Sequence, residues 1–94
     1  MIVRQAELSI EVHCLYANQG PRYRVYVDQD LLTERTFTWP SGKQYVEEHL
    51  VVHLQPGQHK IRIENVDPDL GIITTKNLKL DGIATAGENV FEII

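Results

Sequence analysis

The sequence predicts an all-β protein, an antiparallel, jelly-roll-like β-sandwich of six to eight strands that forms a single domain over residues 1–94. Apolar and polar residues alternate with a period of two in several short segments, which is typical of strands with one buried face. Turn-forming residues separate these segments at regular intervals. No segment supplies the crossover helices that a parallel sheet needs, so we expect antiparallel pairing.

The clearest amphipathic strand runs over residues 6–14, where Leu8, Ile10, Val12 and Cys14 alternate with polar residues. Cys14 shares the apolar parity, so we expect a buried and unreactive thiol. Because it is the only cysteine of the chain, it cannot form an internal disulfide.

Two hairpins are expected to follow this strand. The first joins residues 22–27 to residues 31–39 and has a polar outer face. The second is long, covers residues 44–66, and reverses at Gln55-Pro56-Gly57-Gln58, because proline presets the backbone of a turn and glycine accepts a positive φ. Asp81-Gly82 predicts a further tight turn. The apolar tail Val90–Ile94 predicts a last strand that could pair with a neighbouring copy.

A helix over Tyr45–Leu54, capped by Ser41, is the rival interpretation of the first arm of the long hairpin. On a helix His49 and His53 would lie one turn apart and could share a metal ion. On a strand they would lie about 13 Å apart, too far to share one ion. The β-branched pair Val51-Val52 favours the strand.

Composition narrows the classes of function. The net charge of −4 argues against binding to a nucleic-acid backbone, and five cations are expected to lie on a mixed-charge sheet face rather than in a basic patch: Arg22, Arg24, Arg35, Lys60 and Arg62. No apolar run is long enough to span a bilayer, and the first ten residues lack the pattern of a signal peptide. We therefore expect a soluble protein without a membrane partner, whose compartment the sequence leaves unknown.

Residues 23–31, 54–63 and 65–82 contain Val27-Asp28-Gln29, Pro56-Gly57-Gln58-His59 and Leu80-Asp81-Gly82. In this order, over roughly residues 5–83, they resemble the small jelly-roll carbohydrate-binding modules of the calcium-dependent xylan-binding type. The resemblance implies a noncatalytic module that recognises a polysaccharide or glycan surface. It also implies a calcium site with carboxylates from an acidic loop and from an Asp before the closing strand. That last position falls near Lys76-Asn77, so the sequence keeps the scaffold better than the site.

Asp67 and Asp69 are the candidate ligands of a Ca²⁺ ion, which prefers oxygen donors. Aspartates are also common in turns, and this second interpretation leaves the protein without a cofactor. The loop lacks the closing glutamate of an EF-hand, so that motif is excluded.

Aromatic residues beside loops are the candidate glycan-binding residues, namely Trp39, Tyr45 and Tyr16, because such rings suit a partner that is half apolar and half hydroxylated. Trp39 has an alternative role as a core residue, since tryptophan is highly buried on average.

No catalytic constellation is present, so we expect a protein that is not an enzyme. Glu47 and Glu48 are adjacent and face opposite sides of a strand, and Ser41 has no histidine nearby in the sequence. Two hypotheses of function remain: a glycan-binding module, or a structural or assembly domain, such as a virion or surface component, that binds only protein.

Overall fold

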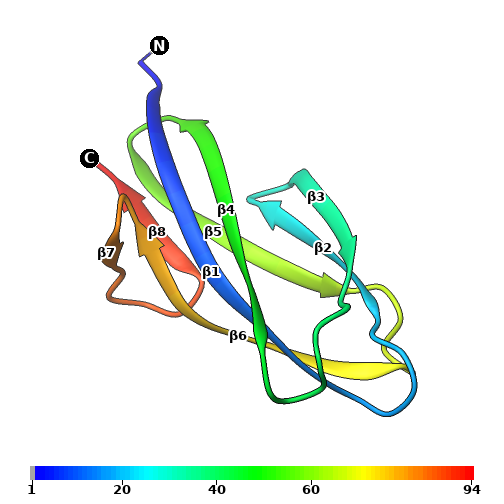
Figure 1. Cartoon of the computed structure of the whole chain (residues 1–94). Helices are drawn as coiled ribbons and strands as arrows, with labels where there is room; N and C mark the ends of the chain where they lie inside the picture. Colours follow the sequence, from blue (N-terminus) through cyan, green and yellow to red (C-terminus); the bar gives the residue numbers. More distant parts are fainter. Residues whose placement is uncertain (1) are drawn as a thin grey trace.

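The computed structural model describes residues 2–94, which form eight strands and no helix. Two four-stranded antiparallel sheets pack face to face, in the orders β4-β1-β6-β7 (first sheet) and β3-β2-β5-β8 (second sheet) (Figure 1). The predicted antiparallel β-sandwich is therefore confirmed. Within the described residues there is no helix of the length and apolarity needed to cross a membrane. The strands are β1 (Arg4–Tyr16), β2 (Arg22–Val27), β3 (Asp30–Thr36), β4 (Tyr45–Leu54), β5 (Gly57–Asn65), β6 (Gly71–Leu80), β7 (Ile83–Ala84) and β8 (Val90–Ile93).

The core lies between the two sheets and follows the alternation of the sequence. The even-numbered residues of β1, from Ala6 to Cys14, are all buried, and they face the buried side chains of β2. Each large aliphatic side chain buried in this way stabilises the fold by about 1.5–3 kcal/mol. The thiol of Cys14 is buried as predicted. The core residues are Ala6, Leu8, Ile10, Val12, Cys14, Tyr23, Val25, Val27, Phe37, Val52, Ile61, Leu78, Phe91 and Ile93.

The chain passes repeatedly from one sheet to the other. Only the β2–β3 and β6–β7 connections join neighbouring strands of one sheet, and every other connection crosses the sandwich. The β2–β3 hairpin and the Asp81-Gly82 turn are confirmed, and both turn residues have positive φ angles of 51° and 83°. The predicted last strand is also confirmed as β8, which pairs with β5.

The prediction of a long hairpin over residues 44–66 is wrong. Both arms are strands, but β4 pairs with β1 in the first sheet, whereas β5 pairs with β2 and β8 in the second. The connection is therefore an arch that crosses the sandwich, and Val52 and Ile61 reach the same core from opposite sheets. Alternation does not distinguish the two arrangements, because a hairpin and an arch both give each strand one buried face.

The helical interpretation of residues 44–54 is excluded, because Tyr45–Leu54 is a strand. His49 and His53 therefore lie about 13 Å apart along it, at roughly 3.3 Å per residue, and cannot share a metal ion.

Candidate functional site at the loop end

Four of the five predicted site residues meet at one end of the sandwich, which we call the loop end. It consists of residues 17–21, 37–44 and 66–70, which connect strands of the two sheets. Tyr16 closes β1 at this end, and Trp39, Asp67 and Asp69 belong to the loops. The crossings of the chain between sheets bring these distant parts of the sequence together (Figure 1).

Hydrogen bonds hold the loop of residues 37–44 against the end of β1. The Tyr16 N–H donates to Ser41 Oγ at 2.7 Å, and the Tyr16 hydroxyl donates to the Trp39 carbonyl oxygen at 2.7 Å. The Gly42 N–H donates to the Cys14 carbonyl oxygen at 2.9 Å. Gly42 also has a φ of 69°, a left-handed conformation that glycine adopts without strain. The position of Trp39 is thus fixed through its own backbone.

Trp39 is 46% exposed, so its alternative interpretation as a core residue is wrong. Strand β3 ends at Thr36, and Phe37 takes the core position instead with 1% exposure. The Phe37 ring meets the Tyr16 ring edge to face, with 6.3 Å between the ring centroids. Pro40, which cannot donate to a strand ladder, then keeps Trp39 at the rim of the sandwich.

A depression of about 430 Å³ opens beside Tyr16 at the loop end. Its lining combines aromatic rings with side chains that form hydrogen bonds, and its walls come from three separate parts of the chain. Trp39 directly follows the lining residue Thr38. The lining residues are Tyr16, Asn18, Gln19, Gly20, Arg22, Thr36, Phe37, Thr38, Asp67 and Leu70.

Tyr45, the third predicted aromatic residue, does not line this depression. It lies opposite His13 on the outer face of the first sheet, where the two rings are tilted against one another with centroids 4.9 Å apart. Its side chain is 45% exposed. Tyr16 instead shares the inward parity of β1 and packs against the core. The three predicted aromatic residues therefore do not form one continuous platform.

An exposed aliphatic pair lies next to Tyr45 and His13. Leu15 and Ile72 are cross-strand partners of β1 and β6, and they are 60% and 65% exposed. The sequence analysis did not identify this pair. Alternation along the strand nevertheless predicts an exposed Leu15, because Leu15 lies on the same face as Glu11 and His13.

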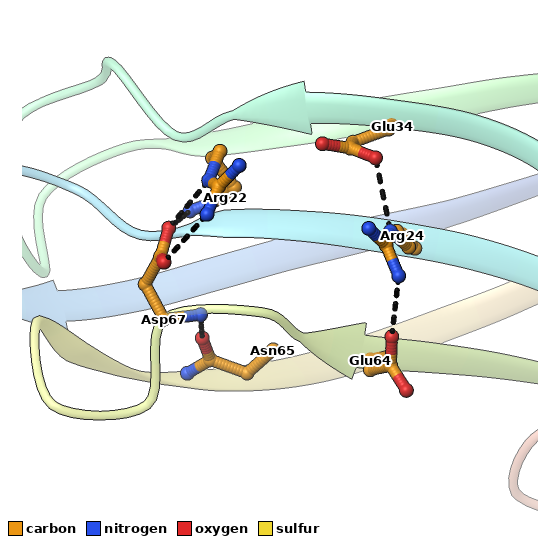
Figure 2. Close-up of polar contacts among 6 residues, drawn as sticks. All are labelled: Arg22, Arg24, Glu34, Glu64, Asn65 and Asp67. Atoms are coloured by element: carbon orange, nitrogen blue, oxygen red, sulfur yellow. Dashed lines mark hydrogen bonds and ion pairs between the residues drawn. The ribbon is translucent and has the colours of Figure 1, made fainter.

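Asp67 is held by a bidentate ion pair with Arg22 (Figure 2). Its Oδ2 accepts from the backbone N–H and Nε of Arg22, both at 2.9 Å, and its Oδ1 accepts from Nη2 at 3.0 Å. The Asp67 N–H donates to Asn65 Oδ1 at 3.0 Å. The hydrogen bonds from Arg22 lower the pKa of Asp67 to about 2. This pair ties the start of β2 to the loop that leads into β6.

The residues of the loop end do not fit the calcium site that the family resemblance implies. Both carboxylate oxygens of Asp67 are already bound by a cationic side chain. Asn77, near the position of the expected third carboxylate, lies in β6, and its amide donates to Glu11 instead. Among residues 2–94 no group of three or more His, Cys, Asp or Glu side chains could hold a metal ion. Calcium binding by Asp67 and Asp69 therefore stays an untested expectation from the sequence.

The expected mixed-charge face is present on the outside of the second sheet, but the expectation is wrong for Arg35, which lies opposite the buried Tyr23 and forms an ion pair with Glu48. Arg24 lies between Glu34 and Glu64, with nitrogen to oxygen distances of 2.9 and 3.4 Å (Figure 2). Arg62 lies over the Tyr26 ring, 4.2 Å from its centroid. These cations therefore have acidic or aromatic partners and do not form a basic patch.

A buried carboxylate at the core was not foreseen. Glu47 and Glu48 face opposite sides of β4, as predicted, but Glu48 is only 1% exposed. The Tyr23 hydroxyl donates to Glu48 Oε1 at 2.8 Å, and the Arg35 guanidinium forms an ion pair with the same carboxylate. Burial and this hydrogen bond raise the pKa of Tyr23. Alternation gives no signal for such a residue, because it assigns glutamate to a solvated face.

No known protein family, no curated protein and no solved structure matches the chain. The residues of the loop end are therefore the basis for a proposal of function.

Proposed function

We propose that the chain is a noncatalytic glycan-binding domain that holds a sugar in the depression at the loop end. The observation that carries the proposal is the chemical mixture of its lining. Tyr16 offers an aromatic surface, while Asn18 and Thr38 offer amide and hydroxyl groups. A sugar has the same mixture, with apolar ring faces and polar edges. A volume of about 430 Å³ is within the range of small-molecule sites.

The ion pair of Arg22 and Asp67 adds polar groups to the wall of the depression. Arg22 donates in a fixed planar geometry and Asp67 accepts, so together they suit two neighbouring hydroxyl groups. Trp39 is exposed and follows the lining residue Thr38, and in this proposal its ring extends the aromatic surface at the rim. In this proposal Tyr45 lies outside the sugar site.

A glycan array followed by calorimetry tests this proposal. Trp39→Ala should weaken binding of the captured glycan roughly tenfold or more, as expected for an aromatic anchor. Its stability should change by less than about 1 kcal/mol, because the side chain is at an exposed site. Leu31→Ala is the matched control, since Leu31 is 52% exposed and lies near the β2–β3 turn, away from the depression. An array without any captured glycan would contradict the proposal.

The exposed aliphatic pair favours a second candidate, a structural or assembly domain that binds protein. Leu15 and Ile72 offer no hydrogen bonds and suit an apolar protein surface better than a sugar. If a partner protein binds the wild type, Ile72→Glu should abolish that binding and Trp39→Ala should leave it unchanged. The opposite result, loss with Trp39→Ala alone, would assign the interaction to the depression.

A further inference from the structure

Strand β4 is a long edge of the first sheet that no proline, lysine or bulge interrupts. It pairs with β1 in continuous register, from Arg4 opposite Leu54 to His13 opposite Tyr45, and the other side of β4 is the sheet edge. The backbone groups on that side are open to another strand. Proteins usually protect such edges with proline, lysine, a bulge or an inward-pointing charge. The sequence of β4, YVEEHLVVHL, contains neither proline nor lysine, and its inward-pointing charge, Glu48, is already paired with Arg35 of the same copy.

The other edges of the two sheets are short or irregular. Strand β7 has two residues and β8 has four, and the pairing of β3 with β2 shifts register between Val25 and Tyr26. Strand β6 is also an edge beyond its two pairs with β7, but its pairing with β1 shifts register between Ser9 and Glu11. Strand β4 has ten residues and carries Val51, which is 58% exposed at its centre. Among these edges it therefore offers the longest regular ladder.

We infer that β4 binds the β4 of a second copy of this chain, antiparallel, so that the two first sheets become one continuous sheet. The contact is a twofold symmetric one, in which each favourable pair of residues occurs twice. It does not rest on the glycan site, because β4 contributes no residue to the depression.

The faces of the sheet limit the register of this pairing. Residues opposite one another across two strands point to the same face, and the odd-numbered residues of β4 are exposed on the outer face. An odd residue must therefore face an odd residue of the second copy. Among the registers that use nearly the whole strand, two remain, with either His49 or Leu50 opposite itself.

Hydrogen bonding across the strands decides between these two registers. With His49 on the twofold axis, two imidazoles would face one another, and Glu47 would face Val51. With Leu50 on the axis, Glu47 of each copy faces His53 of the other, and His49 faces Val51. Glu47 already accepts from its own His49, with 2.8 Å between Oε1 and Nε2. The second register thus places Glu47 near a histidine of each copy, and we adopt it.

On the inner side the same register pairs apolar residues at the axis and near the strand ends, while Glu48, which is paired with Arg35 in its own copy, faces Val52 of the second copy. Leu50 meets its own counterpart, and Val46 meets Leu54. All three side chains are partly buried and pack against the core of their own copy. The pairing therefore extends both the backbone ladder and the core of each sandwich.

Sedimentation over a range of protein concentrations tests the inference, together with a charge exchange across the twofold axis. Wild type should form a dimer. Glu47→Lys and His53→Glu should each weaken dimerisation roughly tenfold, because they replace two Glu–His pairs across the strands by Lys opposite His or by Glu opposite Glu. The double variant restores both pairs in reversed order and should recover most of the affinity.

Two controls keep the experiment decisive. Both positions are exposed, so each variant should melt near the wild-type temperature, which checks that the fold is retained. Glu88→Lys makes the same change of charge in the β7–β8 connection, away from β4, and should dimerise like wild type. A wild type that stays monomeric at every concentration overturns the inference. A dimer whose affinity is the same in wild type and in both single variants also overturns the inference.

Discussion

At the scale of the residue, His59 is the clearest case of a side chain whose protonation the geometry determines. Its Nδ1 lies 2.7 Å from Asp28 Oδ2, and its Nε2 lies 2.8 Å from the Gln55 carbonyl oxygen. Both partners are acceptors, so these contacts favour the imidazolium form, in which both ring nitrogens donate. Its face stacks on Phe91, with 5.7 Å between the centroids. His59 therefore ties the β2–β3 turn and the β4–β5 arch to β8.

The pKa values of this pair follow from the same contacts. Burial opposes the charge of His59, but the hydrogen bonds to Asp28 and Gln55 outweigh it and raise the pKa of His59 above its usual value of 6.5. Burial likewise opposes the charge of Asp28. The hydrogen bonds from His59 and the Lys60 N–H outweigh it, and the pKa of Asp28 falls below its usual value of 3.8.

We predict a stability that depends on pH through this pair. The contribution of His59 is complete below pH 6.5 and is lost as the pH rises through its raised pKa in the folded protein. The contribution of Asp28 is complete above pH 3.8 and is lost as the pH falls through its lowered pKa. Denaturant titrations at a series of pH values above 6.5 should show wild type losing stability relative to His59→Gln as the pH rises. Parallel curves for the two proteins across this range would contradict the prediction.

The contact between Asp28 and His59 also bears on the motifs of the family resemblance. Asp28 and His59 belong to two of the sequence motifs that carry it, and in the structure they bind one another. Their role is to join two turns of the scaffold, so these motifs indicate the fold rather than the ligand.

At the scale of the element, Glu48 connects strands across the sandwich. It lies on β4 in the first sheet, and its partners Tyr23 and Arg35 lie on β2 and β3 in the second. A buried carboxylate is costly without a cation, whereas an uncharged group of similar shape is well tolerated. The ion pair thus fixes how the edges of the two sheets lie over one another.

Replacing Arg35 alone should therefore lower the free energy of unfolding more than replacing both Arg35 and Glu48. Arg35→Met should destabilise the protein by about 3 kcal/mol, because it leaves Glu48 buried and unpaired. Arg35→Met combined with Glu48→Gln should recover most of that loss, since glutamine still accepts from the Tyr23 hydroxyl. Urea titrations of wild type, both single variants and the double variant measure the coupling. Additive effects of the two changes would show that the ion pair does not stabilise the fold.

At the scale of the whole molecule, alternation in the sequence predicts the strands and their faces but not the sheets. Each arm of residues 44–66 has one apolar face, and only the packed structure shows that Pro56 and Gly57 turn the chain across the sandwich. Gly57 has a φ of 125°, which suits glycine alone and differs from an ordinary tight turn. The loop end was unpredictable for the same reason. Tyr16 and Asp67 line one depression only because the chain crosses between the sheets around them.

The tie between Arg22 and Asp67 leads to a prediction about calcium for the molecule as a whole. Added calcium should leave the melting temperature unchanged, because the guanidinium already holds both oxygens of the principal candidate ligand. A ligand that binds only the folded state would raise the melting temperature by mass action. Thermal melts with calcium chloride and with sodium chloride of equal ionic strength separate binding from screening.

Arg22→Ala sharpens this test, because it releases Asp67 without removing the carboxylate. The variant should melt below wild type, since the tie between β2 and the loop before β6 is lost. If calcium then stabilises the variant but not the wild type, the arginine occupies the place that a cation would take. A rise in the wild type that disappears with Asp67→Asn would instead show that Asp67 binds calcium despite Arg22, and the ion pair would have to open in the folded protein.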